Sequence, residues 1–177
     1  MLRTSFTLLA AVAVLGLSAP ASADDQEASG NPLSVHGGLY LPVGNWADAA
    51  GIGIGANVRY SHALSDVLNV TGGLGLVFHL PKEYPLIGDV SVMEIPVMAG
   101  VTYELGSLFV FGELGLNLVR VSGDAGSDSE TEVALFAGAG YDLGAIDVRG
   151  GIMASSISEF GDSMSIVVLA GYEFMRL

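Results

Sequence analysis

The side chains of this sequence that could take part in acid–base chemistry are its histidines and a small set of carboxylates. His79 and Glu94 flank a stretch that a hairpin could close, which would place the imidazole roughly opposite the carboxylate. A His–carboxylate pair can activate a serine nucleophile. The run His62-Ala-Leu-Ser65 does not suit that role, because its spacing is wrong and it lies at a different turn. The sequence therefore predicts no catalytic residue and no enzyme.

A run of carboxylates between residues 123 and 132 is the second candidate for chemistry. Oxygen ligands spaced along a loop can hold Ca²⁺, but this run does not reproduce a complete EF-hand pattern. We therefore interpret it as a solvated acidic loop, and we predict no metal and no cofactor. The other long loops predicted below are acidic as well, through Asp48, Glu83, Asp89, Glu159 and Asp162.

The N-terminus has the three-part pattern of a secretory signal peptide. Arg3 lies in a short start, an apolar core runs from Phe6 to Leu17, and small residues follow. This core is shorter than the ~20 residues that a membrane-spanning helix needs, so we expect cleavage between Ala23 and Asp24 rather than anchoring. The expected organisation is a signal peptide at 1–23, a short flexible segment at 24–32 and a folded barrel domain at 33–177.

Composition limits the class of protein. Hydrophobic residues make up 51% of the chain and charged residues 14%, whereas soluble domains are about one-quarter charged. Yet no long uncharged apolar run follows the signal segment, so the mature chain offers no membrane-spanning helix. A closed β-barrel is the other backbone arrangement that satisfies every peptide group within lipid. The net charge of −13 excludes nucleic-acid binding, and the absence of cysteine excludes disulfides.

Strict alternation along the chain supports the barrel. From Ile52 to Tyr60, apolar residues occupy one parity, while Asn57 and Arg59 fall on the other. Such a period of two indicates strands with one apolar and one polar face. A soluble barrel or sandwich would bury the apolar face, and its outer face would then be rich in glycine, which is a poor strand-surface residue. Similar segments occupy residues 35–43, 52–60, 68–80, 93–104, 108–118, 133–142, 146–152 and 166–174.

These eight segments predict an all-β, eight-stranded, antiparallel, up-and-down transmembrane barrel. Short turns are expected at Ser65-Asp66, Gly106-Ser107 and Gly144-Ala145, and longer loops at 44–50, 81–90, 122–131 and 156–163. In outer-membrane barrels, short turns face the periplasm and long loops face outward. Both ends of the barrel domain would then lie on the periplasmic side.

The two faces of the strands carry different candidate residues. The inward parity predicts a lumen charge network, which is either a salt-bridged plug or a narrow ion or proton path; we favour the plug because eight strands enclose a space that side chains roughly fill. Its members are Arg59, Glu94, Glu104, Glu113, Asp142, Asp147, Arg149 and Glu173. The outward parity predicts a periplasmic aromatic girdle, because tyrosine prefers the membrane interface. Its members are Tyr60, Tyr103, Tyr141 and Tyr172.

With these features the mature chain resembles the small bacterial outer-membrane β-barrel superfamily, the porin-like and opacity-protein-like domains related to OmpX and the OmpA barrel. The resemblance rests on the glycine-rich alternating strands, the Tyr-x-Leu-Gly turn ends and the final strand Val167 to Phe174. Such chains commonly end on an aromatic residue, whereas this one ends at Leu177. The His-x-Ser-Asn run of lipid A deacylases within this superfamily is absent.

The resemblance implies a place in the outer membrane of a Gram-negative cell envelope and a structural or surface-interaction role. A narrow ion or small-solute channel is the alternative, and a lipid-modifying enzyme is a third. The expected partners are outer-membrane lipids and lipopolysaccharide, the barrel-assembly machinery during insertion, and an unidentified envelope or surface partner. We expect a monomer.

Overall fold

The structure is a computed structural model that describes residues 31–84, 88–123 and 126–177. The predicted signal peptide, its cleavage site between Ala23 and Asp24, and nearly all of the predicted flexible segment at 24–32 lie outside the described residues. The first strand begins at Pro32, next to the predicted start of the barrel domain at residue 33.

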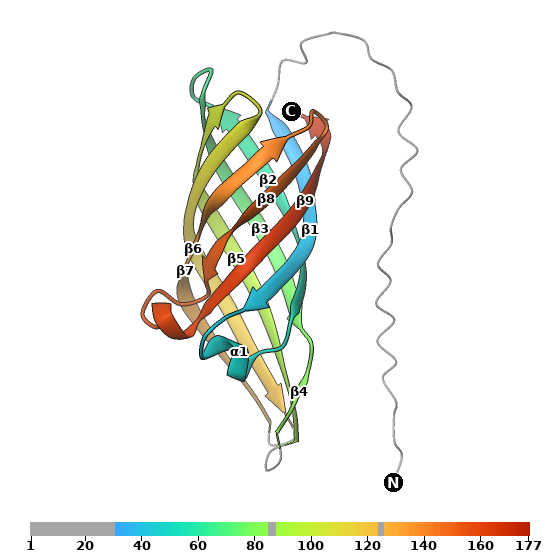
Figure 1. The fold of residues 1–177 in the computed structure, drawn as a ribbon, viewed down its shortest axis with the longest axis vertical. Coiled ribbons are helices and arrows are strands. Elements are labelled where there is room, and N and C mark those ends of the chain that lie inside the picture. The colour runs from blue at the N-terminus through green and yellow to red at the C-terminus, as the bar shows by residue number, and fades with distance from the viewer. Residues whose placement is uncertain (1–30, 85–87, 124–125) are drawn as a thin grey trace.

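The chain forms a closed antiparallel barrel of eight strands, in which each barrel strand pairs with the barrel strands before and after it in the chain and β1 pairs with β9 (Figure 1). The barrel strands are β1 (Pro32–Pro42), β2 (Gly53–Ala63), β3 (Leu68–His79), β5 (Gly88–Leu105), β6 (Leu108–Gly123), β7 (Gly126–Asp142), β8 (Ile146–Ala154) and β9 (Met164–Arg176). Pairing of β3 with β5 completes the closure, and the short strand β4 (Lys82–Tyr84) pairs with the start of β5. The predicted eight-stranded, up-and-down barrel is confirmed.

The apolar parity of each strand faces outward, as the alternation predicts. Val58 in β2, Leu114 in β6 and Ile152 in β8 expose 46%, 53% and 53% of their surface. Their sequence neighbours Arg59 and Glu113 are buried in the interior. This orientation is the reverse of a soluble barrel, which buries its apolar set. No helix among the described residues is long and apolar enough to cross a membrane.

Tight turns join the strands at one end of the barrel, which we call the short-turn end. Gly106 and Gly144 have φ values of 75° and 96°, a left-handed backbone that glycine adopts without strain. Leu105 pairs with Leu108 around the first of these turns, and the Leu143 N–H donates to the Ile146 carbonyl across the second. The start of β1 and the end of β9 lie at this same end (Figure 1). The predicted short turns are confirmed.

The opposite end, which we call the long-loop end, differs from the predicted loops. The helix α1 (Trp46–Ala49) and the 3-10 turn η1 (Phe160–Asp162) lie there. The segments 81–90 and 122–131 were expected to be loops, but β5 begins at Gly88 and β6 and β7 remain paired out to Gly123 and Gly126. Backbone pairing across a hairpin needs no apolar face, so these strands continue after the apolar alternation ends.

Candidate functional site

A buried ion pair links β2 to β6 inside the barrel. Arg59 Nη2 donates to Glu113 Oε2 at 2.9 Å, and Arg59 Nη1 also contacts Glu113 Oε1. The Thr71 hydroxyl of β3 donates to Glu113 Oε1 at 3.2 Å. Arg59 and Glu113 are 5% and 3% exposed, so each charge depends on the other for compensation.

A second group lies where β1, β8 and β9 meet. Arg149 Nε donates to Asp147 Oδ1 at 2.8 Å and to His36 Nε2 at 3.0 Å. The same His36 nitrogen lies 2.9 Å from Asp147 Oδ2. Arg149 also stacks over the Phe109 ring, with its guanidinium carbon 5.0 Å from the ring centroid. The alternation along the chain predicts Asp147 and Arg149 in the lumen, whereas the contact of His36 with them was not predicted.

The third group lies toward the long-loop end and is built around Glu94 of β5. His79 Nε2 is 2.7 Å from Glu94 Oε1, which is the pairing that the hairpin between β3 and β5 predicted. The other carboxylate oxygen, Oε2, accepts hydrogen bonds from Asn117 Nδ2 at 2.5 Å and from the Ser155 hydroxyl at 2.7 Å. The serine therefore contacts the carboxylate and not the imidazole. In a catalytic serine site the imidazole stands between these two groups.

The remaining members of the predicted lumen set lie near the short-turn end. Asn69 Nδ2 donates to Glu104 Oε1 at 2.6 Å. The Gly144 N–H donates to Asp142 Oδ1 at 2.7 Å, and Arg176 Nη2 donates to Glu173 Oε2 at 2.9 Å. Glu104 and Asp142 are exposed and Glu173 is half-buried, so these three form a rim rather than a buried network.

Large apolar side chains share the interior with the charges, a feature that was not predicted from the sequence. The rings of Phe111 and Phe136 meet edge to face at 4.8 Å between centroids. The buried apolar cluster among the described residues consists of Tyr40, Val77, Met98, Phe109, Phe111, Ala134, Phe136, Met153, Val167 and Leu169. Parity in the sequence indicates this burial. Phe109 and Phe111 alternate with the lipid-facing leucines on the same parity as Glu113, and Phe136 lies on the inward parity of its own strand.

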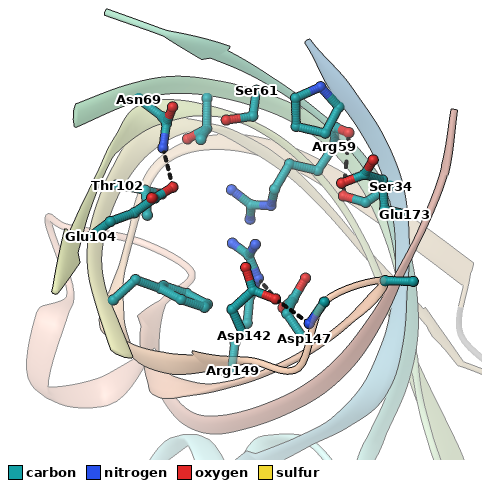
Figure 2. A pocket seen from close by; sticks show the side chains of 15 residues that line it. Ser34, Arg59, Ser61, Asn69, Thr102, Glu104, Asp142, Asp147, Arg149 and Glu173 are labelled. Carbon is teal, nitrogen blue, oxygen red and sulfur yellow. Dashed lines mark hydrogen bonds and ion pairs between the residues drawn. The ribbon is translucent and has the colours of Figure 1, made fainter. Parts of the chain in front are cut away.

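Two larger cavities lie on either side of this packed region. The short-turn cavity, of about 110 Å³, contains Arg59, Arg149 and Asp147 together with the rim carboxylates (Figure 2). The long-loop cavity, of about 220 Å³, is lined by acidic residues of β7, by Glu159 and by Trp46. Between them is a space of about 20 Å³ that Tyr40, Met98 and Phe136 help to enclose.

The structure places the predicted tyrosines on the outer surface near the short-turn end. Tyr60, Tyr103 and Tyr141 are exposed and Tyr172 is half-buried. Tyr141 pairs with Leu108 and Tyr172 with Ile146, beside the short turns.

The acidic run of β7 projects beyond the barrel at the long-loop end (Figure 1). Asp128 and Glu130 are exposed, and Glu132 is half-buried and accepts a hydrogen bond from the Ser156 hydroxyl at 2.8 Å. Pairing of β7 with β8 begins at Leu135, so β7 has β6 as its one paired neighbour over the described residues 126–132. Among the described residues, no group of three or more potential metal ligands is clustered tightly enough to hold an ion.

Comparison with known proteins agrees with this architecture. No curated protein sequence matches the chain significantly. Ail of Yersinia pestis superposes with a TM-score of 0.54 at 18% identity, over 81% of this chain and 97% of Ail, and Ail has also been seen in complex with the heparin analogue sucrose octasulfate. Neisserial surface protein A superposes with a TM-score of 0.51 at 12% identity, over 81% of this chain and 96% of that one.

The N-terminal barrel domain of Pseudomonas aeruginosa OprF gives a TM-score of 0.51 at 11% identity, over 81% of this chain and 96% of that one. At these identities the likeness concerns the fold. The sequence itself matches the family model of the outer membrane protein beta-barrel domain over residues 8–174. The chain therefore belongs to the outer membrane protein beta-barrel domain family and is a bacterial outer-membrane barrel.

Proposed function

We propose that this chain is a structural barrel, plugged by its own side chains, that acts at the cell surface through the acidic sheet at its long-loop end. One observation carries the proposal. The β6–β7 hairpin extends well beyond the membrane-facing apolar band and is acidic, while the interior beneath it is packed. In outer-membrane barrels the long-loop end faces outward, so this hairpin would face the cell exterior.

The packed interior supports a plug rather than a channel. Glu94 is 2% exposed and its oxygens are engaged by His79, Asn117 and Ser155, so it is not free to bind a passing ion. The space between the two larger cavities, about 20 Å³, is large enough for about one water molecule and too small for a hydrated ion. An ion would have to lose its hydration to pass through it, which is costly.

Truncating the aromatic pair tests the plug. We expect the wild-type barrel to give no stable conductance steps in planar bilayers. The double variant Phe111→Ala, Phe136→Ala should conduct, because it removes two rings that pack between the cavities. Phe78→Ala removes a ring from the lipid-facing surface and should stay silent. Stable steps from the wild type, abolished by a change at Glu113 or Arg149, would favour the channel instead.

The arrangement around Glu94 supports a non-enzymatic role. Ser155 donates directly to the carboxylate, and the His79 imidazole, which would have to stand between the two groups as the general base, contacts the other carboxylate oxygen instead. Mass spectrometry of lipid A after expression tests this conclusion, and a lipid A modification that Ser155→Ala abolishes would overturn it.

The charge of the long-loop end supports cationic rather than anionic partners. The acidic residues described there are Asp48, Glu83, Asp89, Asp128, Glu130, Glu132, Glu159 and Asp162, and the basic ones are Lys82 and Arg120. Like charges across an interface are strongly unfavourable. A sulfated sugar such as the one bound to Ail would therefore be repelled here, whereas divalent cations could bridge these carboxylates to lipopolysaccharide phosphates.

Cation removal tests the bridge. We expect EDTA to lower the midpoint of thermal unfolding of the barrel in lipopolysaccharide-containing membranes, with no change in membranes of phospholipid alone. In the triple variant Asp128→Asn, Glu130→Gln, Glu132→Gln, EDTA should lower the unfolding midpoint less, because the variant lacks carboxylates that would bind the cation. An unchanged midpoint in lipopolysaccharide would contradict the proposal.

The effect of EDTA on the unfolding midpoint should also depend on pH. Outside the membrane-spanning part of β7, the protonated Glu130 donates a hydrogen bond to Glu132, and this bond together with repulsion by the Glu132 charge raises the pKa of Glu130 above its usual value. A raised carboxyl pKa means that charge repulsion destabilises the hairpin at neutral pH and is relieved as the pH falls through that pKa. The response to EDTA should therefore shrink on acidification.

A further inference from the structure

Two buried arginines share the short-turn cavity. Figure 2 shows the guanidinium groups of Arg59 and Arg149 pointing toward each other near the centre of the cavity. They come from β2 and β8, on opposite sides of β1 and β9 in the sheet. Arg59 is 5% exposed and Arg149 is 8% exposed, and their charges repel each other. Repulsion between buried like charges is weakened little by solvent.

The carboxylate partners of these arginines do not use all of the buried donors. Glu113 binds the outer nitrogens of Arg59, and Asp147 binds Nε of Arg149. Arg59 Nε, Arg149 Nη1 and the Thr102 hydroxyl are buried without a hydrogen-bond partner in the protein. Unpartnered buried donors are uncommon in folded proteins, and charged ones are the most costly.

We propose that the short-turn cavity binds one small tetrahedral oxyanion, of the phosphate or sulfate type, between Arg59 and Arg149. A volume of about 110 Å³ is several times the ~10–15 Å³ that one water molecule needs in a cavity, so it leaves room for such an ion. An oxyanion would accept hydrogen bonds from the unused arginine donors and separate the two positive charges.

The carboxylates at the rim of the cavity do not accept hydrogen bonds from the unused arginine donors. Glu104 accepts from Asn69, and Asp142 accepts from the backbone of Gly144, so both are engaged at the mouth of the cavity. Both side chains are exposed, and their repulsion of an incoming anion is screened by salt. The cavity therefore has solvent-exposed carboxylates at its opening and buried arginines at its base. This inference concerns the short-turn end and is independent of the plug and of the acidic hairpin.

Calorimetric titration of the refolded barrel tests the site. The probe is inorganic sulfate at constant ionic strength, in dodecyl maltoside, a detergent without phosphate. We expect saturable binding with one site per barrel for the wild type. Arg149→Met should bind about tenfold more weakly or worse, because it removes a charged donor while keeping an apolar stem. Arg120→Met is the matched control; Arg120 is exposed at the long-loop end, and this variant should bind like the wild type.

A second variant gives a change in the opposite direction. Asp147→Asn removes the carboxylate that competes for Arg149, so it should bind sulfate severalfold more tightly. Damage to the fold alone would weaken binding in both variants, and tighter binding by Asp147→Asn supports the site even where Arg149→Met does not refold. Three results would each overturn the proposal. The first is a heat signal that does not saturate, the second is equal sulfate affinity in the wild type and Arg149→Met, and the third is weaker sulfate binding by Asp147→Asn.

The source of the anion can be distinguished in the same assay. Repeating the titration in a phosphocholine detergent offers a lipid-type phosphate to the cavity. If the heat of sulfate binding disappears in this detergent, a headgroup phosphate reaches the arginines. If the heat of sulfate binding is unchanged, the site takes free oxyanions. Both results support the oxyanion site that the maltoside titration establishes.

Discussion

Glu113→Gln is expected to lower the free energy of unfolding by about 3–5 kcal/mol, because it leaves the buried guanidinium of Arg59 without its counter-charge. The glutamine keeps the size of the side chain, so the loss reports the charge and not a cavity. Urea unfolding in lipid vesicles measures it. Trp46, the single tryptophan of the chain, supplies the fluorescence signal.

A matched control is available in the same barrel. Glu104 also belongs to the inward parity, but it is exposed and bonds to Asn69, so Glu104→Gln should change stability by less than about 1 kcal/mol. The double variant Arg59→Met, Glu113→Gln should recover much of the loss, since no buried charge is then left alone. Equal losses for the two glutamate variants would show that burial of the pair does not matter.

Gly100→Ala is expected to destabilise the barrel by at least about 3 kcal/mol, at or above the upper end of the range for an overpacked site. Gly100 in β5 faces Glu113 in β6, and an added Cβ would lie 2.1 Å from the Gly112 carbonyl oxygen and 2.6 Å from the Glu113 Cα. Both contacts are with backbone, so the two strands would have to separate. The shift in heat-modifiable gel mobility with temperature measures the effect.

Gly112 is the matched control, because it lies on the neighbouring strand and faces outward into open space. Gly112→Ala should leave the unfolding midpoint within a few degrees of the wild type, or raise it slightly through reduced freedom of the unfolded chain. If the two alanine variants behave alike, close approach of the strands at Gly100 is not what requires glycine there.

Much of the fold could be predicted because one simple rule governs it. A lipid-facing strand must be apolar on alternate residues, and the run from Ile52 to Tyr60 follows that rule closely enough to show which face is which. Turn positions followed from glycines such as Gly106, whose positive φ few other residues tolerate. The His79–Glu94 contact was predicted by assuming a hairpin centred near residues 84–87; Glu94 pairs with Val77, and the His79 side chain reaches the carboxylate diagonally across the two strands.

No comparable sequence rule predicts the packing of the lumen, the contact of His36 or the outer part of β7. The inward face mixes charged, small and aromatic residues, so parity places Phe111 and Phe136 inside the barrel but does not show that they form a packed core, and the lumen was described by its charges alone. His36 reaches Asp147 across β9, a contact between distant segments that depends on the stagger of the closed sheet. The outer part of β7, residues 126–132, is polar on both faces, so its composition resembles that of a loop.

The mixture of glycine and large residues on the inward face has a consequence for how such barrels diversify. Strand number and stagger fix the circumference of the backbone, whereas the bore depends on which inward positions carry a side chain. Gly73 and Gly75 leave it wide, and Phe109 and Phe136 fill it. Exchanging a few of these residues alters the bore without disturbing a single strand pairing. Closed and conducting descendants of one ancestor can therefore differ at a handful of codons.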